Sequence, residues 1–421
     1  MSTPDDAPSA PFARNDAGGI AAADDAEAVE ANESEHDDGA DDARRLLTAA
    51  WRRPFADWNW LHLLHLSLLS TVGVTLRSFL GRLFGGDCET AAAGGTIDDW
   101  LWPVSHRVCV TANGRTAQHG GALFIDLPAN MVGSFLMGFV TGHSTDWPAI
   151  PCLRRDHPLQ HDTGLHVGVR TAVCGTLTTF SSWNTQMVVM MDGTANPYLG
   201  SQVIAAMVGY LLGLQVAADS FRSGRTVNAW LMRRKHPDLF SSRQSTSERE
   251  APPPRLTWYA PALSFAIFAL LVGLFMAGDF RWGIPYYREL WIACVAAPVG
   301  TALRWRLSTL NKRDGRRWFP LGTFLANLVA SVLSAGLQAQ ALVAARRDAV
   351  EEGAWAQPTL AAVSLGVAGS LSTVSTFAKE CVEHHEKSSQ YEKETFLYSL
   401  GTLLACCFAG LMVYSPIVRY M

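Results

Sequence analysis

A short polar motif occurs twice in this chain, each time inside a long apolar segment. Residues 175–186 read Gly-Thr-Leu-Thr-Thr-Phe-Ser-Ser-Trp-Asn-Thr-Gln, and residues 369–380 read Gly-Ser-Leu-Ser-Thr-Val-Ser-Thr-Phe-Ala-Lys-Glu. The same two elements precede it in each half: a Gly-x-x-x-Arg motif starting at Gly73 or Gly300, then an asparagine, Asn130 or Asn327. Because the repeat distance of roughly 195 to 230 residues is far too long for a solenoid, we infer that a whole helical domain is duplicated.

The chain after residue 58 is a series of apolar stretches, each long enough to cross a bilayer. A membrane-spanning α-helix needs about 20 mostly apolar residues. Trp and Tyr, which anchor helices at the membrane interface, stand at many of the ends. We therefore predict an all-α integral membrane protein. Its nine expected spans lie near residues 60–83, 121–142, 164–190, 198–219, 257–277, 288–309, 319–343, 359–380 and 396–417.

The N-terminal segment has a different composition. Residues 1–50 are dominated by Ala, Asp, Glu and Gly, so they are expected to form a disordered acidic tail. This tail dominates the formal charge of −4. It does not resemble a secretory signal, so the first apolar helix is expected to act as its own signal. The eight cysteines show no metal-ligand spacing, and Cys88 and Cys109, in one expected extramembrane loop, are candidates for a disulfide.

Lys and Arg residues are distributed unevenly among the expected loops. They gather before the first span, between spans two and three, between spans four and five, after span six, and between spans eight and nine. All of these segments lie on one side if the spans alternate, and the positive-inside rule makes that side cytoplasmic. We therefore expect a multi-pass protein of the plasma membrane with a cytoplasmic N-terminus and an extracytoplasmic C-terminus.

The number of spans determines how the two repeats are related. Spans one to four form a first domain at residues 58–220, and spans six to nine form a second domain at residues 286–421. Residues 221–285 form a basic cytoplasmic linker and one spacer helix, so the second repeat enters the membrane from the opposite side. The two four-helix repeats are therefore expected to be inverted, with the substrate site near the membrane midplane between them. The side chains of the spacer helix are expected to matter little.

The hydroxyl-rich third span of each repeat is expected to be a broken helix. Ser and Thr also occur as small residues at helix contacts, hydrogen-bonded to their own backbone, but their density in residues 176–182 favours a break. A break exposes carbonyls that can coordinate a cation, and amides and hydroxyls that can face an anion. It is tolerated at membrane depth only where protein or a water-filled cavity covers it.

Three residue types near this motif indicate a path for an anion. Phe180 and Phe377 lie beside polar runs, and the positive edge of an aromatic ring can solvate a small anion. Asn130 and Asn327 place amides inside apolar helices, where an amide either joins helices or lines a path. The arginines of the two Gly-x-x-x-Arg motifs near the ends of the first spans are either interfacial residues or a positive vestibule.

These motifs resemble those of the Fluc/CrcB fluoride channels and, in particular, their fused eukaryotic form, the fluoride exporters (FEX). The family pattern has Gly-x-x-x-Arg in the first helix and Gly-Thr-x-x-x-Asn-x-x-Gly-Ser-Phe in the second. Its third helix carries Gly-Gly-Phe-Thr-Thr-Phe-Ser-Thr-Phe-Ser-x-Glu. Asn130 with Gly133-Ser134-Phe135 matches the end of the second motif, and Gly322-Thr323 with Asn327 matches its beginning. The resemblance covers both expected domains.

The resemblance implies a fluoride-selective channel with particular site residues. Bacterial members are antiparallel dimers with two pores, so one chain holding both repeats is expected to work as a monomer. Backbone carbonyls are expected to hold a structural Na⁺ at Gly175, Thr178, Gly369 and Ser372. The residues expected at the fluoride pore are Phe180, Phe377, Asn130, Asn327, Ser181, Thr376, Glu380, Arg77 and Arg304.

The two expected pores are not equivalent. In the family, each pore draws its first aromatic residue from one half and its second from the other. Here one pore pairs Phe180 with Phe377, and the other pairs Trp183 with Val374. An indole facing an aliphatic side chain offers no matched pair of ring edges, and the motif glutamate of the second half has Gln186 as its counterpart. We therefore expect one working pore and one vestigial pore.

Passive fluoride export is the favoured function. Fluoride that enters as HF ionises in the cytosol, and an inside-negative potential supplies about 2.3 kcal/mol per charge per 100 mV for the anion to leave. The alternative is a coupled secondary anion transporter, a proton/anion exchanger with Asp126 or Glu380 as the proton carrier. The duplicated polar motifs disfavour a purely structural role. No motif indicates an enzyme, a nucleic-acid partner or an ATP-driven pump with a phosphate loop.

Tags at single positions test the predicted orientation. Tags at residues 240 and 315 are expected on the cytoplasmic side, and tags at residue 100 and at the C-terminus on the other side, because the spans alternate around one spacer helix. Labelling of intact cells with a membrane-impermeant reagent measures the side of each tag. If residues 240 and 315 lie on opposite sides, the repeats are not inverted.

Overall fold

The computed structural model describes residues 60–84, 124–142, 163–193, 199–235, 259–283, 285–311, 318–347, 356–387 and 392–420. All of these stretches belong to one unit, Asn59–Met421. The expected acidic tail, the candidate pair Cys88 and Cys109, and the basic linker beyond residue 235 lie outside the described residues.

The regular elements in the described stretches are all helices, and they overlap the expected spans, although the fourth continues to Lys235, past its expected end at residue 219 and into the expected linker. The first repeat contains α2 (Trp60–Phe84), α3 (Leu127–Thr141), α4 (Thr163–Val167), η5 (Gly168–Cys174), α5 (Gly175–Leu177), α6 (Phe180–Asp192) and α7 (Leu199–Lys235). The spacer is α9 (Tyr259–Trp282). The second repeat contains α10 (Pro285–Ser308), η6 (Thr309–Asn311), α11 (Leu321–Arg347), α12 (Ala356–Val363), η7 (Ser364–Ala368), α13 (Gly369–Leu371), α14 (Ser375–Lys387) and α15 (Glu392–Tyr420).

Six segments in the described part of the chain are long and apolar enough to cross a membrane. They are formed by α2, α7, α9, α11 and α15, and by the continuous stretch from α12 to α14. α3 is a shorter apolar helix of 15 residues, and α10 carries charged side chains and an internal proline. These helices confirm the predicted all-α, multi-pass membrane fold.

The third span of each repeat is interrupted at its hydroxyl-rich motif, as predicted. It begins with a π-helical stretch (η5 or η7), continues as a short α-helix (α5 or α13), and then becomes extended. Thr178 has φ −89° and ψ 147°, and Ser372 has φ −80° and ψ 162°. The helix then resumes as α6 or α14. Such a break is favoured by hydroxyl and β-branched side chains, which compete for backbone hydrogen bonds or lose rotamer freedom in a helix.

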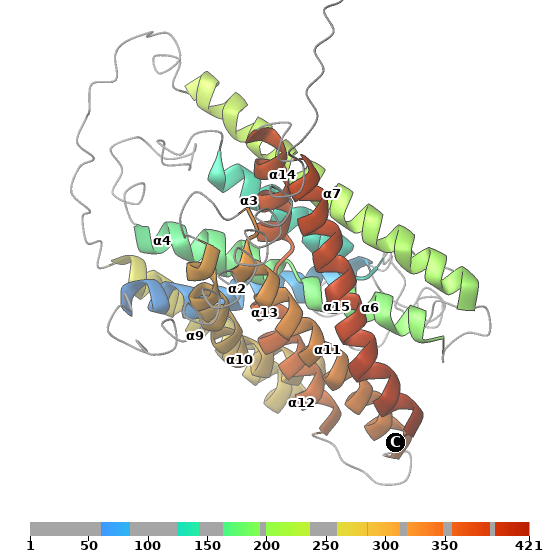
Figure 1. Ribbon diagram of the computed structural model, residues 1–421. Helices are drawn as coiled ribbons and strands as arrows, with labels where there is room; N and C mark the ends of the chain where they lie inside the picture. Colours follow the sequence, from blue (N-terminus) through green and yellow to red (C-terminus); the bar gives the residue numbers. More distant parts are fainter. Residues whose placement is uncertain are drawn as a thin grey trace, which may run out of the picture. The chain divides into compact units, whose positions relative to one another are not determined.

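α3 and α7 form the most extensive helix contact in the described part of the chain (Figure 1). Two glycines bring these helices close together. A Cβ on Gly138 would overlap the carbonyl oxygen of Phe221, and a Cβ on Gly224 would lie 2.8 Å from Phe139 N. Small residues let the backbones of membrane helices approach in this way. α7 has 37 residues, a length of about 55 Å, so it extends well past a hydrocarbon core of about 30 Å.

The spacer helix α9 is docked by specific polar contacts, contrary to the expectation that its side chains matter little. Its apolar outer face is exposed, as lipid contact requires. On its inner face, Ser264 is hydrogen-bonded to His65 of α2 (3.0 Å). The buried Asp279 accepts a hydrogen bond from Arg288 of α10 (3.1 Å). A buried carboxylate is destabilising without its cation. The spacer therefore contributes specific contacts to the fold, in addition to inverting the second repeat.

Gly138→Val is expected to destabilise the protein by about 1–3 kcal/mol, because the added side chain would meet backbone atoms that cannot move aside. The matched control is Gly401→Val in α15, where a Cβ would meet nothing within 4 Å. Thermal unfolding of the purified proteins measures the difference. Equal melting temperatures for the two variants would contradict the close contact between α3 and α7.

Candidate functional site

The two helix breaks meet, and each caps the helix of the other repeat. Ser372 Oγ accepts hydrogen bonds from the N–H groups of Phe180 (3.2 Å) and Ser181 (3.0 Å), at the start of α6. Thr178 Oγ1 accepts hydrogen bonds from the N–H groups of Val374 (3.2 Å) and Ser375 (3.1 Å), at the start of α14. The first N–H groups of a helix have no intrahelical partner, and hydrocarbon offers none. Each repeat therefore satisfies the helix N-terminus of the other.

Further contacts at this junction are also made in both directions. Ser181 Oγ donates to Ala368 O and Ser375 Oγ donates to Cys174 O, each at 3.2 Å. A surface that contacts its own counterpart in this reciprocal way has two-fold symmetry. The repeats are therefore related by a pseudo-two-fold axis through the breaks, which agrees with the predicted inverted pair.

Asn130 and Asn327 hold the extended backbone of the breaks. Asn130 Oδ1 accepts the N–H of Thr179 (2.8 Å), and its Nδ2 donates to the Thr179 carbonyl (3.3 Å). Asn327 makes the same two hydrogen bonds to Thr373, at 2.8 and 3.3 Å. Thr373 Oγ1 in turn accepts the N–H of Thr376 (3.3 Å), in the first turn of α14. The two buried asparagines, predicted to contact fluoride, thus act as clamps on the backbone.

The Gly-x-x-x-Arg motif brings the first span of each repeat against the break. A Cβ on Gly73 would overlap Thr176 Oγ1, and a Cβ on Gly300 would lie 2.9 Å from Leu371 N. Glycine therefore lets α2 and α10 approach the third span of their own repeat. The arginine follows four residues later, which places it on the same helix face about one turn away.

Both motif arginines are buried at the breaks. The sequence suggested that these arginines are either interfacial side chains or line an open vestibule. Because Arg77 is 2% exposed and Arg304 is 4% exposed, neither description fits. Arg77 donates to the carbonyl of Thr176 (3.1 Å) in its own repeat and to the carbonyl of Leu365 in the other. The first span thus supplies a charge that joins the two repeats.

Arg304 donates hydrogen bonds to two of the carbonyls expected to hold Na⁺. Its Nη1 donates to Gly175 O (2.8 Å) and to Ser372 O (2.9 Å). A cation on these oxygens would stand close to the guanidinium, and like charges about 4 Å apart repel by about 4 kcal/mol at an effective dielectric constant of 20. With Arg304 in this position, two of the four expected carbonyls, those of Gly175 and Ser372, do not fit a sodium site.

The aromatic residues of the two motifs form one continuous cluster. The rings of Phe180 and Phe377 meet edge to face, with centroids 5.7 Å apart and planes at 88°. Phe180 also meets the indole of Trp183 (5.4 Å), and Phe377 meets Tyr398 of α15 (5.3 Å). The structure thus brings together the two rings that were expected to share one pore.

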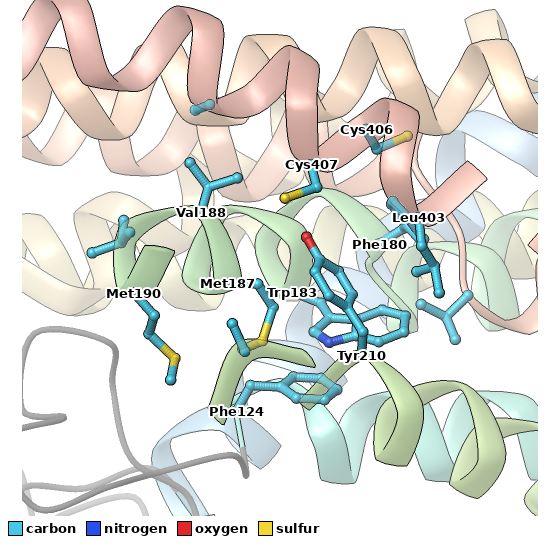
Figure 2. Close-up of a cluster of buried hydrophobic side chains, with 14 of the residues drawn as sticks. Phe124, Phe180, Trp183, Met187, Val188, Met190, Tyr210, Leu403, Cys406 and Cys407 are labelled. Atoms are coloured by element: carbon cyan, nitrogen blue, oxygen red, sulfur yellow. The ribbon is translucent and has the colours of Figure 1, made fainter. Parts of the chain in front are cut away.

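Trp183 packs as a core residue in the first repeat. Its indole stacks on Phe124 (5.2 Å) and lies against Tyr210 of α7 (5.6 Å), as Figure 2 shows. Val374 is buried in the same apolar cluster. The indole Nε1 is also buried and has no hydrogen-bond partner among the described residues. The space around Trp183 is therefore filled by side chains.

A carboxylate, Glu380, lies one turn beyond Phe377 on α14. It accepts hydrogen bonds from Tyr398 OH (2.7 Å), Thr323 Oγ1 (2.7 Å) and Asn311 Nδ2 (3.0 Å). Sequence reasoning noticed Thr323 only as part of a motif and missed Tyr398 and Asn311. Neither has a counterpart in the repeated pattern, so only proximity in the fold identifies them.

The first repeat has a carboxylate in a different place. Asp126 stands four residues before Asn130, where the second repeat has Thr323, and Gln186 stands where the second repeat has Glu380. Asp126 accepts hydrogen bonds from Ser182 Oγ (2.5 Å) and Gln186 Nε2 (3.3 Å). At these two pairs of equivalent positions, each repeat therefore keeps one acid, on the second span in the first repeat and on the third span in the second.

A cavity of about 490 Å³ lies between α6 of the first repeat and α10, α11, α12 and η7 of the second. Its polar lining residues are Ser182, Thr185, Gln186, Glu289, Ser334, Gln338 and Ser364. The residues from α6 recur at helical spacing and form one face. Sequence reasoning missed the polar residues of the second repeat, because single Ser and Gln residues in apolar helices form no motif.

Asn327→Leu is expected to destabilise the protein by about 1–3 kcal/mol, because the buried N–H and carbonyl of Thr373 would lose their partner. The control is Gln215→Leu on α7, where the side chain is exposed and the change is expected to stay within about 0.5 kcal/mol. Thermal unfolding measures both variants. Unchanged stability in Asn327→Leu would contradict the clamp.

One family model matches this chain in two separate regions. The family is described as "CrcB-like protein, Camphor Resistance (CrcB)", and the matched residues are 64–214 and 291–414. No curated protein and no solved structure matched. The matched regions fall in the two repeats and leave out the spacer α9, and together they cover more than half of the chain. The chain therefore belongs to the CrcB-like family and holds two family regions in one polypeptide.

Proposed function

We propose that this protein is a passive fluoride channel that exports cytoplasmic fluoride, of the fused eukaryotic exporter type (FEX). Membership of the CrcB-like family supports fluoride as the transported ion. The observation that carries the proposal is the edge-to-face pair of Phe180 and Phe377, which meets at the junction of the repeats. Ring edges carry partial positive charge, so this pair suits a small anion better than a cation.

The proposed route passes from the Glu380 cluster, along the two rings, to the polar cavity. α6 and α14 leave the breaks in opposite directions in an inverted pair. The cavity beside α6 and the Glu380 cluster beside α14 are therefore proposed to lie on opposite sides of the rings. With a cytoplasmic N-terminus, Glu380 faces the cytoplasm and the cavity faces the exterior.

Fluoride on this route needs replacement donors, because transfer of an ion into an apolar medium without partners is prohibitive. Near the cytoplasmic end, the hydroxyls of Tyr398 and Thr323 donate to Glu380, and the Tyr398 ring contacts Phe377, so these hydroxyls are proposed to turn toward a passing ion. Near the exterior, Ser182 and Thr185 line the cavity. Ser181, Thr376 and the two asparagines hold the backbone that sets the spacing of the rings.

The second pore is proposed to be vestigial. Its aromatic position is occupied by Trp183, which is packed between Phe124 and Tyr210, and its partner is the aliphatic Val374. An indole facing an aliphatic side chain does not offer an ion two matched ring edges. One chain thus holds one working pore, and a monomer in the plasma membrane is sufficient for export.

Replacement of the aromatic residues tests the single-pore assignment. Phe180→Ile and Phe377→Ile are each expected to reduce fluoride efflux from proteoliposomes by at least about tenfold, equivalent to about 1.4 kcal/mol, because an aliphatic side chain has no positive edge. The matched control is Trp183→Ile, whose efflux per folded protein is expected to stay near that of the wild type. Size-exclusion chromatography corrects for misfolded protein. Equal loss in Trp183→Ile would contradict the single working pore.

The mode of transport is measured in the same proteoliposomes. A passive channel carries fluoride current that follows voltage and is not coupled to a pH gradient. Chloride is expected to be excluded strongly, because a larger halide fits poorly in a pore about as narrow as fluoride. Electroneutral flux that follows the pH gradient would instead favour a proton/anion exchanger, with Asp126 or Glu380 as the proton carrier. Comparable chloride and fluoride currents would contradict fluoride selectivity.

A further inference from the structure

Carbonyl groups from both repeats converge on one guanidinium at the centre of the junction. Arg304 Nη1 lies 2.8 Å from Gly175 O in the first repeat and 2.9 Å from Ser372 O in the second. Arg304 Nη2 donates to a third carbonyl, that of Thr171. These carbonyls belong to the two interrupted third spans. The interruption therefore creates a set of oxygens around a positive charge.

The glycines of the polar motifs make room for the arginines. A Cβ on Gly175 would lie 2.6 Å from Arg304 Cζ, and a Cβ on Gly369 would lie 2.7 Å from Arg77 Cζ. Each contact joins a glycine of one repeat to the arginine of the other. Any side chain at these positions would displace the guanidinium, so these glycines are matched to an arginine neighbour.

The carbonyls also supply the solvation that a buried charge requires. Arg77 and Arg304 are almost fully buried, and neither forms an ion pair with a residue that the structure describes. A buried charge is tolerated only when hydrogen bonds replace its water. The carbonyls of the interrupted spans provide these bonds to the Nη atoms, whereas the Nε of each arginine is buried without a partner among the described residues.

The two arginines do not hold equivalent carbonyls. Arg77 Nη1 donates to Thr176 O (3.1 Å), whereas Arg304 Nη1 bridges Gly175 O and Ser372 O. Only Arg304 therefore joins, through a single nitrogen, two of the carbonyls that a central cation would use.

We propose that the guanidinium of Arg304 takes the place of a structural cation at the centre of this protein, so that the folded state does not depend on Na⁺. It neutralises the convergent carbonyl dipoles of both breaks and links the two repeats. A bound sodium ion would need the same oxygens beside a fixed positive charge. The proposal concerns the fold and does not rest on fluoride as the transported ion.

Thermal unfolding in different salts tests this proposal. The purified wild-type protein in detergent is expected to have the same melting temperature in NaCl, KCl and N-methyl-D-glucamine chloride at equal ionic strength. Arg304→Met removes the charge and the donors but keeps an unbranched side chain, so it exposes the carbonyl set. Its melting temperature is expected to fall, and to rise again by several degrees in NaCl relative to KCl, because a ligand that binds the folded state stabilises it.

The matched control is Arg77→Met, which is expected to lower the melting temperature without a specific response to Na⁺. Arg304→Lys keeps a positive charge and is expected to remain insensitive to Na⁺, which gives a second test if Arg304→Met does not fold. A rise of several degrees for the wild type in NaCl over KCl would overturn the proposal. Equal responses to Na⁺ in Arg77→Met and Arg304→Met would overturn the specific role of Arg304. Because the measurement is stability, its result is independent of fluoride flux.

Discussion

The reciprocal capping of two broken helices is the interaction on which the rest of this structure depends. A helix that restarts within a membrane begins with unpaired N–H groups, and the lipid cannot satisfy them. Ser372 supplies the acceptor for α6, and Thr178 supplies it for α14. Each repeat therefore leaves backbone groups that only the other repeat satisfies. This mutual dependence explains why two domains with a long separation in the chain form one unit.

The buried arginines follow from the same breaks. An intact helix uses its carbonyls internally, so it has none to offer a buried cation. The π-helical and extended segments around the breaks release carbonyls such as Gly175 O and Ser372 O, and Arg304 binds them. The glycine one turn before each arginine lets the first span come close enough for this contact. The hydroxyl-rich motif thus provides the free carbonyls, and the Gly-x-x-x-Arg motif provides the arginine that binds them.

The duplication left the backbone symmetric and allowed the side chains to diverge. Both asparagine clamps and both cross-repeat caps have the same partners and nearly the same distances in the two halves. The aromatic and acidic positions differ: Trp183 occupies the motif position that Phe377 has in the second repeat, and Gln186 occupies the position of Glu380. Residues that complete the backbone are needed twice, because both helices must be capped. Residues that line a path are needed only once if one path carries the ion.

The amino-acid sequence by itself determined the apolar spans, the duplication and the position of the helix breaks. These features are local, since span length, motif order and hydroxyl density can all be read within one segment. Only the tertiary structure decided what the motif residues contact. The sequence left open whether Arg77 and Arg304 were interfacial or lined a vestibule, and whether Asn130 and Asn327 joined helices or lined a path. It also suggested that spacer side chains mattered little. Their observed partners are backbone groups and side chains of other helices. The capping hydrogen bonds join residues 191 to 197 positions apart, and no pattern along a single segment specifies a partner at that distance. Packing of one repeat against the other selects it, because the buried polar groups of both breaks must be satisfied at once.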